Sequence, residues 1–173
     1  MHPDVLFRRG QSTAVSIRAV ASRCSVSAGT IYNYYESKAD LLGDTIESIW
    51  REIFFNPEDE QAFNDVAACI SWIYKRLEYG NEQFPGFFSL HSLGFMKDEK
   101  MDGKKKMLQT WGHILNGLCD ILKNDPKIRP DVFDEQFTEK QFADILFSLI
   151  LVSMIRQDYN PSSILMLINK TLY

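Results

Sequence analysis

The apolar residues of this chain recur every three or four positions through almost its whole length. The segment 104–123 shows the pattern, with apolar side chains at Met107, Leu108, Trp111, Leu115, Leu118 and Leu122. This spacing is that of an α-helix with one buried face. No run between turn residues shows the four or more strict apolar/polar alternations that mark a half-buried strand. The sequence therefore predicts an all-α protein.

The size and composition are those of a globular protein. A chain of 173 residues can bury a core without disulfides or metal. Its richest apolar run, 145–155, falls short of the roughly 20 residues that a membrane helix needs. The three cysteines, Cys24, Cys69 and Cys119, form no CxxC pair, which suits reduced thiols. We therefore expect a cytoplasmic protein without a membrane partner.

No motif in the sequence points to catalysis. There is no glycine-rich phosphate loop, no HExxH and no GxSxG. The histidines, His2, His91 and His113, stand at metal-ligand spacing from no cysteine or carboxylate. We therefore expect no enzyme activity, no metal and no cofactor.

Positive charge is concentrated at the N-terminal end. Residues 1–38 carry a balance of +3, whereas the remaining residues carry −7. Such a basic head lets one face of an acidic protein approach a polyanion. The alternative is a chance fluctuation of charge in a short window.

Two short helices are expected within this basic segment. Residues 16–24 and 27–34 have helical patterns, separated by a tight turn at Ser25 and Val26. Helices this short are marginal alone, and such pairs are common as helix-turn-helix units, whose second helix enters the DNA major groove. The alternative is a polar helical hairpin without a partner.

The second short helix carries side chains suited to DNA. Its small or hydrogen-bonding residues lie on one side, at Ser27, Ala28, Thr30, Asn33 and Tyr34. Groups of this kind can approach base edges and phosphates. Gly29 lacks bulk where the backbone would come close to DNA, whereas Val26 and Ile31 point toward the body of the protein.

The same residues match a family pattern. They are Val20-Ala21, Val26-Ser27, Gly29-Thr30-Ile31-Tyr32-Asn33-Tyr34-Tyr35, Ser37-Lys38 and Leu41-Leu42. This dense run of about 25 residues resembles the DNA-binding domain of the TetR family of bacterial regulators. Two positions depart from the family motif, because Ser25 stands where glycine is usual and Tyr35 where phenylalanine is usual. The family's first helix is also about two turns longer than residues 1–9 permit.

The resemblance implies contacts with the DNA backbone. Lys38, at the start of the next helix, would meet a phosphate. Thr30, Tyr32 and Tyr34 would supply hydroxyl groups to phosphates. For Tyr32 the alternative is that its ring wedges the recognition helix against the helix that begins at Lys38.

The resemblance also implies contacts with bases. Ser27, Ala28 and Asn33 would face base edges, with Gly29 allowing close approach, and Asn33 can pair with adenine through two hydrogen bonds. Arg18, on the preceding helix, is the candidate for a guanine contact. The alternative for Arg18 is a surface salt bridge.

A boundary is expected at Asn56-Pro57, because proline disfavours a helical conformation at the residue before it. It divides the chain into a DNA-binding domain, 1–55, and a C-terminal helical bundle, 56–173, for ligand binding and dimerisation. Helices are expected within that bundle at 58–79, 85–96, 104–123, 138–157 and 161–172.

The C-terminal domain is rich in large aromatic residues, which indicates a binding site for a small apolar or aromatic effector. The segment 84–96 is interrupted by proline and glycine, so it is expected to pack irregularly. The expected wall of the site consists of Phe87, Phe88, His91, Met107 and Trp111. The alternative is ordinary core packing, with His91 hydrogen-bonded inside the core.

The segment 138–157 is apolar nearly all round, so it is expected to be buried on two sides. Together with the last helix it predicts a two-fold interface formed by Phe142, Leu146, Leu149, Ile150, Ile164 and Ile168. The alternative is that 138–157 is the central helix of a monomer.

These features together indicate a homodimeric, ligand-responsive DNA-binding regulator, more specifically a repressor that binds a palindromic double-stranded operator. The helix 38–55 would link the DNA-binding and sensing regions. The alternative is a helical small-molecule-binding or scaffold protein that does not use DNA.

Overall fold

The computed structural model describes residues 17–54, 63–88 and 101–173, and every regular element in these ranges is helical. This confirms the predicted all-α fold. The helices are α1 (Ile17–Arg23), α2 (Ala28–Tyr32), α3 (Lys38–Phe54), α4 (Val66–Gln83), α6 (Met101–Asn124), α7 (Glu139–Arg156) and α8 (Ser162–Thr171). No helix of the described ranges is long and apolar enough to cross a membrane. The predicted helix 85–96 lies mostly outside the described residues.

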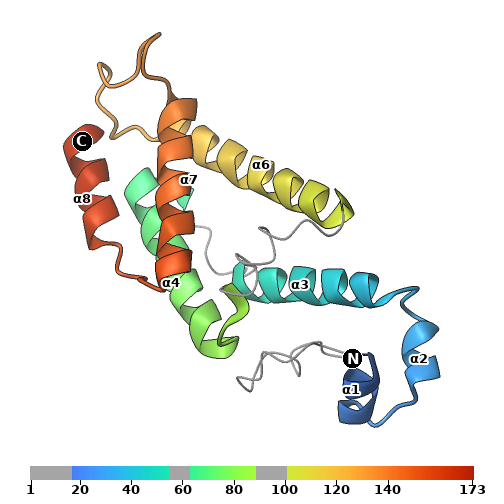
Figure 1. Ribbon diagram of the computed structural model, residues 1–173. Coiled ribbons are helices and arrows are strands. Elements are labelled where there is room, and N and C mark those ends of the chain that lie inside the picture. The colour runs from blue at the N-terminus through green and yellow to red at the C-terminus, as the bar shows by residue number, and fades with distance from the viewer. Residues whose placement is uncertain (1–16, 55–62, 89–100) are drawn as a thin grey trace.

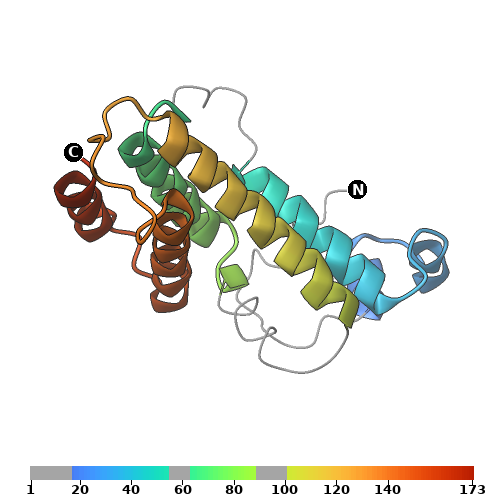
Figure 2. The same cartoon turned by 90° about the horizontal axis from the view of Figure 1, so that it is seen from above.

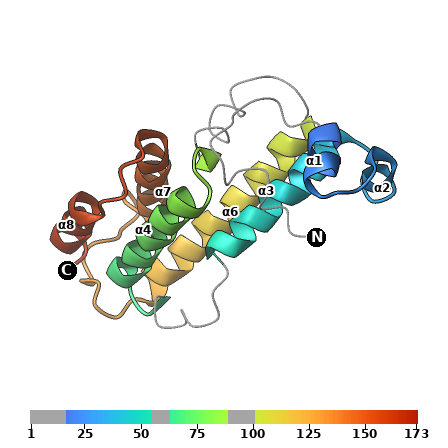
Figure 3. The same cartoon turned by 90° about the horizontal axis from the view of Figure 1, so that it is seen from below.

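The helices form a small unit and a larger bundle, joined by α3. Figure 1 shows α1 and α2 at the N-terminal end of α3, with α4, α7 and α8 at its other end. Figures 2 and 3, from above and below, show the same separation. Within the bundle α4 packs against α6 and α8, and α6 packs against α7. The α1–α2 unit therefore projects from the body.

Two hydrophobic cores match these two parts. The smaller is formed by Ile17, Val20, Ala21, Ile31 and Leu41. The larger fills the bundle, and α3 contributes Ile49 and Ile53 to it. The cores therefore divide within α3, whereas the sequence-based boundary lies after it.

Side-chain caps decide where the bundle helices begin. Asp65 accepts a hydrogen bond from the amide of Ala68 at 2.6 Å, and α4 starts directly after it. The sequence-based start at Glu58 lies outside the described residues. Thr138 and Gln141 form a reciprocal capping box at the start of α7, as the Thr138 start predicted.

Glycine does not end α4, although the sequence-based interpretation ended this helix at Tyr79, before Gly80. The helix continues to Gln83, with Gly80 buried inside it. A Cβ atom on Gly80 would lie 2.7 Å from Cδ1 of Ile53, so this glycine allows α3 and α4 to approach closely. Close packing at this crossing, rather than helix termination, accounts for Gly80.

The one fully buried cysteine is part of the bundle core. Cys69 lies on α4 and its thiol is free, as are those of Cys24 and Cys119. Burial, with a smaller contribution from the negative charge of Asp65, raises the pKa of Cys69 to about 12. The thiol is therefore protonated at neutral pH and behaves as a small apolar side chain.

Candidate nucleic-acid interface

A tight turn sets the angle between α1 and α2. The amide of Val26 donates to the carbonyl oxygen of Ala21 at 2.9 Å, and the amide of Ser25 donates to that of Ser22 at 3.2 Å. Ser25 has a φ of 55°, in the left-handed region. This is a Schellman motif, in which a left-handed residue closes a helix, and it explains why glycine suits the position that Ser25 occupies.

The start of α2 is fixed by its own side chains. The Ser27 hydroxyl oxygen accepts from the amide of Thr30 at 3.0 Å, and the two hydroxyl groups lie 2.9 Å apart. On the opposite side, Ile31 is buried against α1 and Leu41. A helix of only five residues is therefore held by one cap and one buried side chain, which keeps its other face free.

The free face of α2 carries most of the predicted DNA contacts. Ser27, Gly29 and Asn33 are exposed, and Tyr32 and Tyr34 are 56% and 78% exposed. The exposure of Tyr32 speaks against the alternative in which its ring wedges α2 onto α3.

Two of the predicted contact residues are less exposed than the rest. Ala28 and Thr30 are half-buried, and Ala28 packs against the smaller core. Tyr35 also packs against this core. The contact surface of α2 is therefore centred on its exposed side chains.

Lys38 opens α3 beside this face. Ser37 caps the helix, since its hydroxyl oxygen accepts from the amide of Asp40 at 3.2 Å. The same hydroxyl donates to the Asp40 carboxylate at 2.9 Å. The Lys38 side chain is exposed at a helix N-terminus, where amide groups and the helix dipole favour a phosphate.

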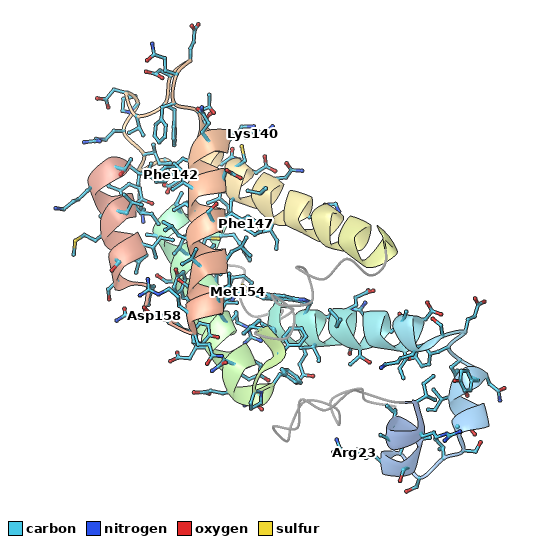
Figure 4. All side chains as sticks on the ribbon, in the orientation of Figure 1. Arg23, Lys140, Phe142, Phe147, Met154 and Asp158 are labelled. Carbon is cyan, nitrogen blue, oxygen red and sulfur yellow. The ribbon has the colours of Figure 1, made fainter. Side chains whose placement is uncertain are left out.

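Exposed arginines extend the basic character to α1. Arg18 is exposed, and no carboxylate of the described residues pairs with it, so the salt-bridge alternative has no support there. Arg23, in the last turn of α1, is also exposed and is labelled in Figure 4. The sequence-based site omitted Arg23, although its charge belongs to the positive balance of residues 1–38.

The predicted effector wall is described only in part. Phe87 and Phe88 are each 1% exposed, and their rings lie 5.5 Å and 5.7 Å from that of Trp50 on α3. His91 lies outside the described residues. Met107 and Trp111 lie on α6, in the part of that helix described by its backbone alone.

The predicted interface residues are mostly internal. Five of the six, Phe142, Leu146, Ile150, Ile164 and Ile168, are buried in the subunit's own core. Figure 4 labels Phe142 on α7, the helix that shares this core with α4 and α8. Only Leu149 is accessible, at 36%. The other five therefore offer little surface to a partner, and their place in a two-fold interface stays a prediction.

The described residues contain no group of three or more potential metal ligands. What they contain is two short helices at a fixed angle, with a polar exposed face and basic side chains at the ends of α1 and α3. This arrangement defines a helix-turn-helix DNA-binding protein.

The family follows from a comparison of the sequence. The model of bacterial regulatory proteins of the tetR family matches residues 6–45, which include α1, α2 and the start of α3. This match to the N-terminal part of the chain supports membership of the TetR family of DNA-binding transcriptional regulators, as the motif predicted. A search of curated proteins found no match to the chain.

Proposed function

We propose that this protein is a homodimeric repressor that binds a palindromic operator in the cytoplasm and responds to a small apolar or aromatic effector. The observation that carries the proposal is the exposed polar face of α2, held by Ser27 and Ile31 and flanked by Arg18 and Lys38. The expected contacts are those of the sequence-based assignment, with Arg23 added as a phosphate contact. In this proposal the chain has no catalytic role.

An exposed apolar face supports dimerisation. On α7 the exposed apolar residues are Ile145, Leu149, Val152 and Ile155, and on α8 they are Met166 and Leu167. The four on α7 fall on one side of the helix, opposite its buried side. Exposed apolar surface of this extent is typical of protein contacts, so we assign this face to a two-fold interface.

The aromatic contacts at the end of α3 support effector response. Trp50, on α3, contacts the rings of both Phe54 and Phe87. An effector that displaced Phe87 or Phe88 would therefore act directly on the helix that carries Lys38. It would change operator affinity by its difference in affinity for the two conformations.

A gel-shift titration tests the proposed function. The purified protein is titrated against the DNA upstream of its own gene at 50 mM and 200 mM salt. Contacts with 6–10 phosphates would lower the affinity roughly 10³–10⁵-fold between these concentrations. Absence of salt-dependent duplex binding would reject the proposal and favour a helical binding protein that does not use DNA.

A further inference from the structure

Arg76 joins α4 to the C-terminal end of α3. Its guanidinium donates one hydrogen bond from Nε to the carbonyl oxygen of Ile53, and another from Nη2 to that of Glu52 at 3.0 Å. Because α3 ends at Phe54, both carbonyls lie in its last turn, where helix carbonyls lack partners within the helix. The guanidinium also lies over the ring of Tyr79, 4.5 Å from its centroid, which restrains its position.

Gly80 lies one turn further along α4, on the same side as Arg76. A Cβ atom there would lie 2.7 Å from Cδ1 of Ile53 and 2.9 Å from Cζ of Phe88. Both neighbours are at most 1% exposed, so they could yield to a Cβ atom only by repacking within the core. Arg76 and Gly80 thus act on the same residue of α3, through its carbonyl oxygen and its side chain.

The length of α3 amplifies any change at this crossing. With seventeen residues at about 1.5 Å each, α3 is about 25 Å long. A rotation of about 10° at Ile53 would move the far end, where Lys38 and α2 lie, by about 4 Å. That displacement is close to one base-pair step of about 3.4 Å.

We propose that Arg76 and Gly80 are positioning residues that fix the angle between α3 and α4, and thereby set the half-site spacing that the dimer accepts. The effect on spacing rests on the proposed function, whereas the effect on the angle does not. Arginine is required because its planar fork can donate to two neighbouring carbonyls, while lysine provides only a point charge. Glycine is preferred because a Cβ atom at position 80 would press on the side chains of Ile53 and Phe88, and we expect this to push the two helices apart.

The angle is measured first, without DNA. Nitroxide labels are attached to Ser22→Cys on α1 and Glu78→Cys on α4, both exposed positions. The background replaces Cys24 and Cys119 by serine and Cys69 by alanine, and labelled subunits are diluted with unlabelled ones. Electron–electron double resonance then gives the distance distribution within one subunit.

Arg76→Met and Arg76→Lys should broaden this distribution, and Gly80→Ala should shift its mean by at least about 2 Å. Lys75→Met removes a positive charge from the adjacent, exposed position and should leave the distribution unchanged. Circular dichroism identifies the variants that are folded. Unchanged distributions in the folded Arg76 and Gly80 variants would overturn the proposal.

The preferred half-site spacing is measured with a set of related duplexes. The parent duplex is one that the wild-type protein selects from a random pool, and its derivatives carry one or two base pairs inserted or deleted at the centre. Arg76→Met should lower the discrimination between parent and one-pair insertion at least about fivefold, and Gly80→Ala should move the preferred spacing. An equal loss of affinity at every spacing would show a merely structural role and overturn the proposal. Failure of the wild-type protein to select any duplex would instead reject the proposed function, and the label distances would still decide the angle.

Discussion

The ammonium of Lys127 lies 2.6 Å from Oδ2 of Asp65, and this pair joins the loop after α6 to the N-cap of α4. The other carboxylate oxygen of Asp65 caps α4 through the amide of Ala68. The hydrogen bond from Lys127, followed by that from Ala68, holds the pKa of Asp65 below its usual value. Ionised Asp65 therefore stabilises the folded state.

We predict that Asp65→Asn lowers the free energy of unfolding at pH 7 and loses this effect in acid. A carboxylate with a lowered folded-state pKa stabilises the protein above its unfolded-state pKa of about 3.9, and the contribution disappears as pH falls through the folded-state value. Asparagine also caps helices well, so the substitution removes mainly the charge. Urea unfolding from pH 7 to pH 2 measures the difference. A difference that stayed constant below pH 4 would contradict the assignment.

Ser25→Gly should raise the free energy of unfolding by about 0.5–1 kcal/mol, because glycine adopts the left-handed conformation without the cost that serine incurs. Ser22→Gly, three residues earlier within α1, is the matched control and should be destabilising by a similar amount. Urea unfolding of the two variants gives the comparison. Equal destabilisation by both would mean that the turn does not require a positive φ.

Lys38→Ala should weaken binding to all DNA sequences alike and lower the slope of log affinity against log salt by about one unit. The reason is the exposed position of Lys38 at the first turn of α3. Fluorescence anisotropy with operator and unrelated duplexes measures both quantities. Lys75→Ala on α4 is the control and should retain the wild-type slope. If the Lys38 variant kept the wild-type slope of log affinity against log salt, Lys38 would not contact a phosphate.

The interface prediction uses two leucines of α7. Leu149→Glu places a charge on the exposed apolar face and should give folded monomers, because a charge buried in the interface would lack a partner. Leu146→Ala creates a cavity in the core and should lower the free energy of unfolding by about 2–5 kcal/mol while leaving the dimer intact. Analytical ultracentrifugation distinguishes them. A wild-type monomer at micromolar concentration would refute the two-fold model.

Helix periodicity and capping residues were enough to predict the fold class and most helices. Thr138 placed the start of α7 and Ser27 that of α2, because a cap acts on residues next to it in sequence. Gly80 led to a wrong prediction for the end of α4, because its role depends on Ile53, a residue of another helix. The residues next to Gly80 in the sequence carry no information on how closely α3 and α4 pack.

The exposed face of α2 was predictable because Ile31 alone marks its buried side. The interface was not, because α7 is apolar on both sides and its sequence does not distinguish them. The structure separates buried Leu146 from accessible Leu149, because Leu146 belongs to the bundle core and Leu149 does not. The hydrogen bonds of Arg76 could not be predicted either, since their acceptors are backbone carbonyls twenty-three and twenty-four residues away.

Hydroxyl-radical footprinting of the wild-type protein on a duplex that it selects tests whether two copies of α2 bind DNA together. We expect two protected patches on one face of the duplex, related by a two-fold axis and about 34–36 Å apart or a multiple of that distance. Lys38→Ala should weaken both patches equally. A single protected patch, or uniform protection without a two-fold centre, would show that two symmetry-related copies of α2 do not bind the duplex together.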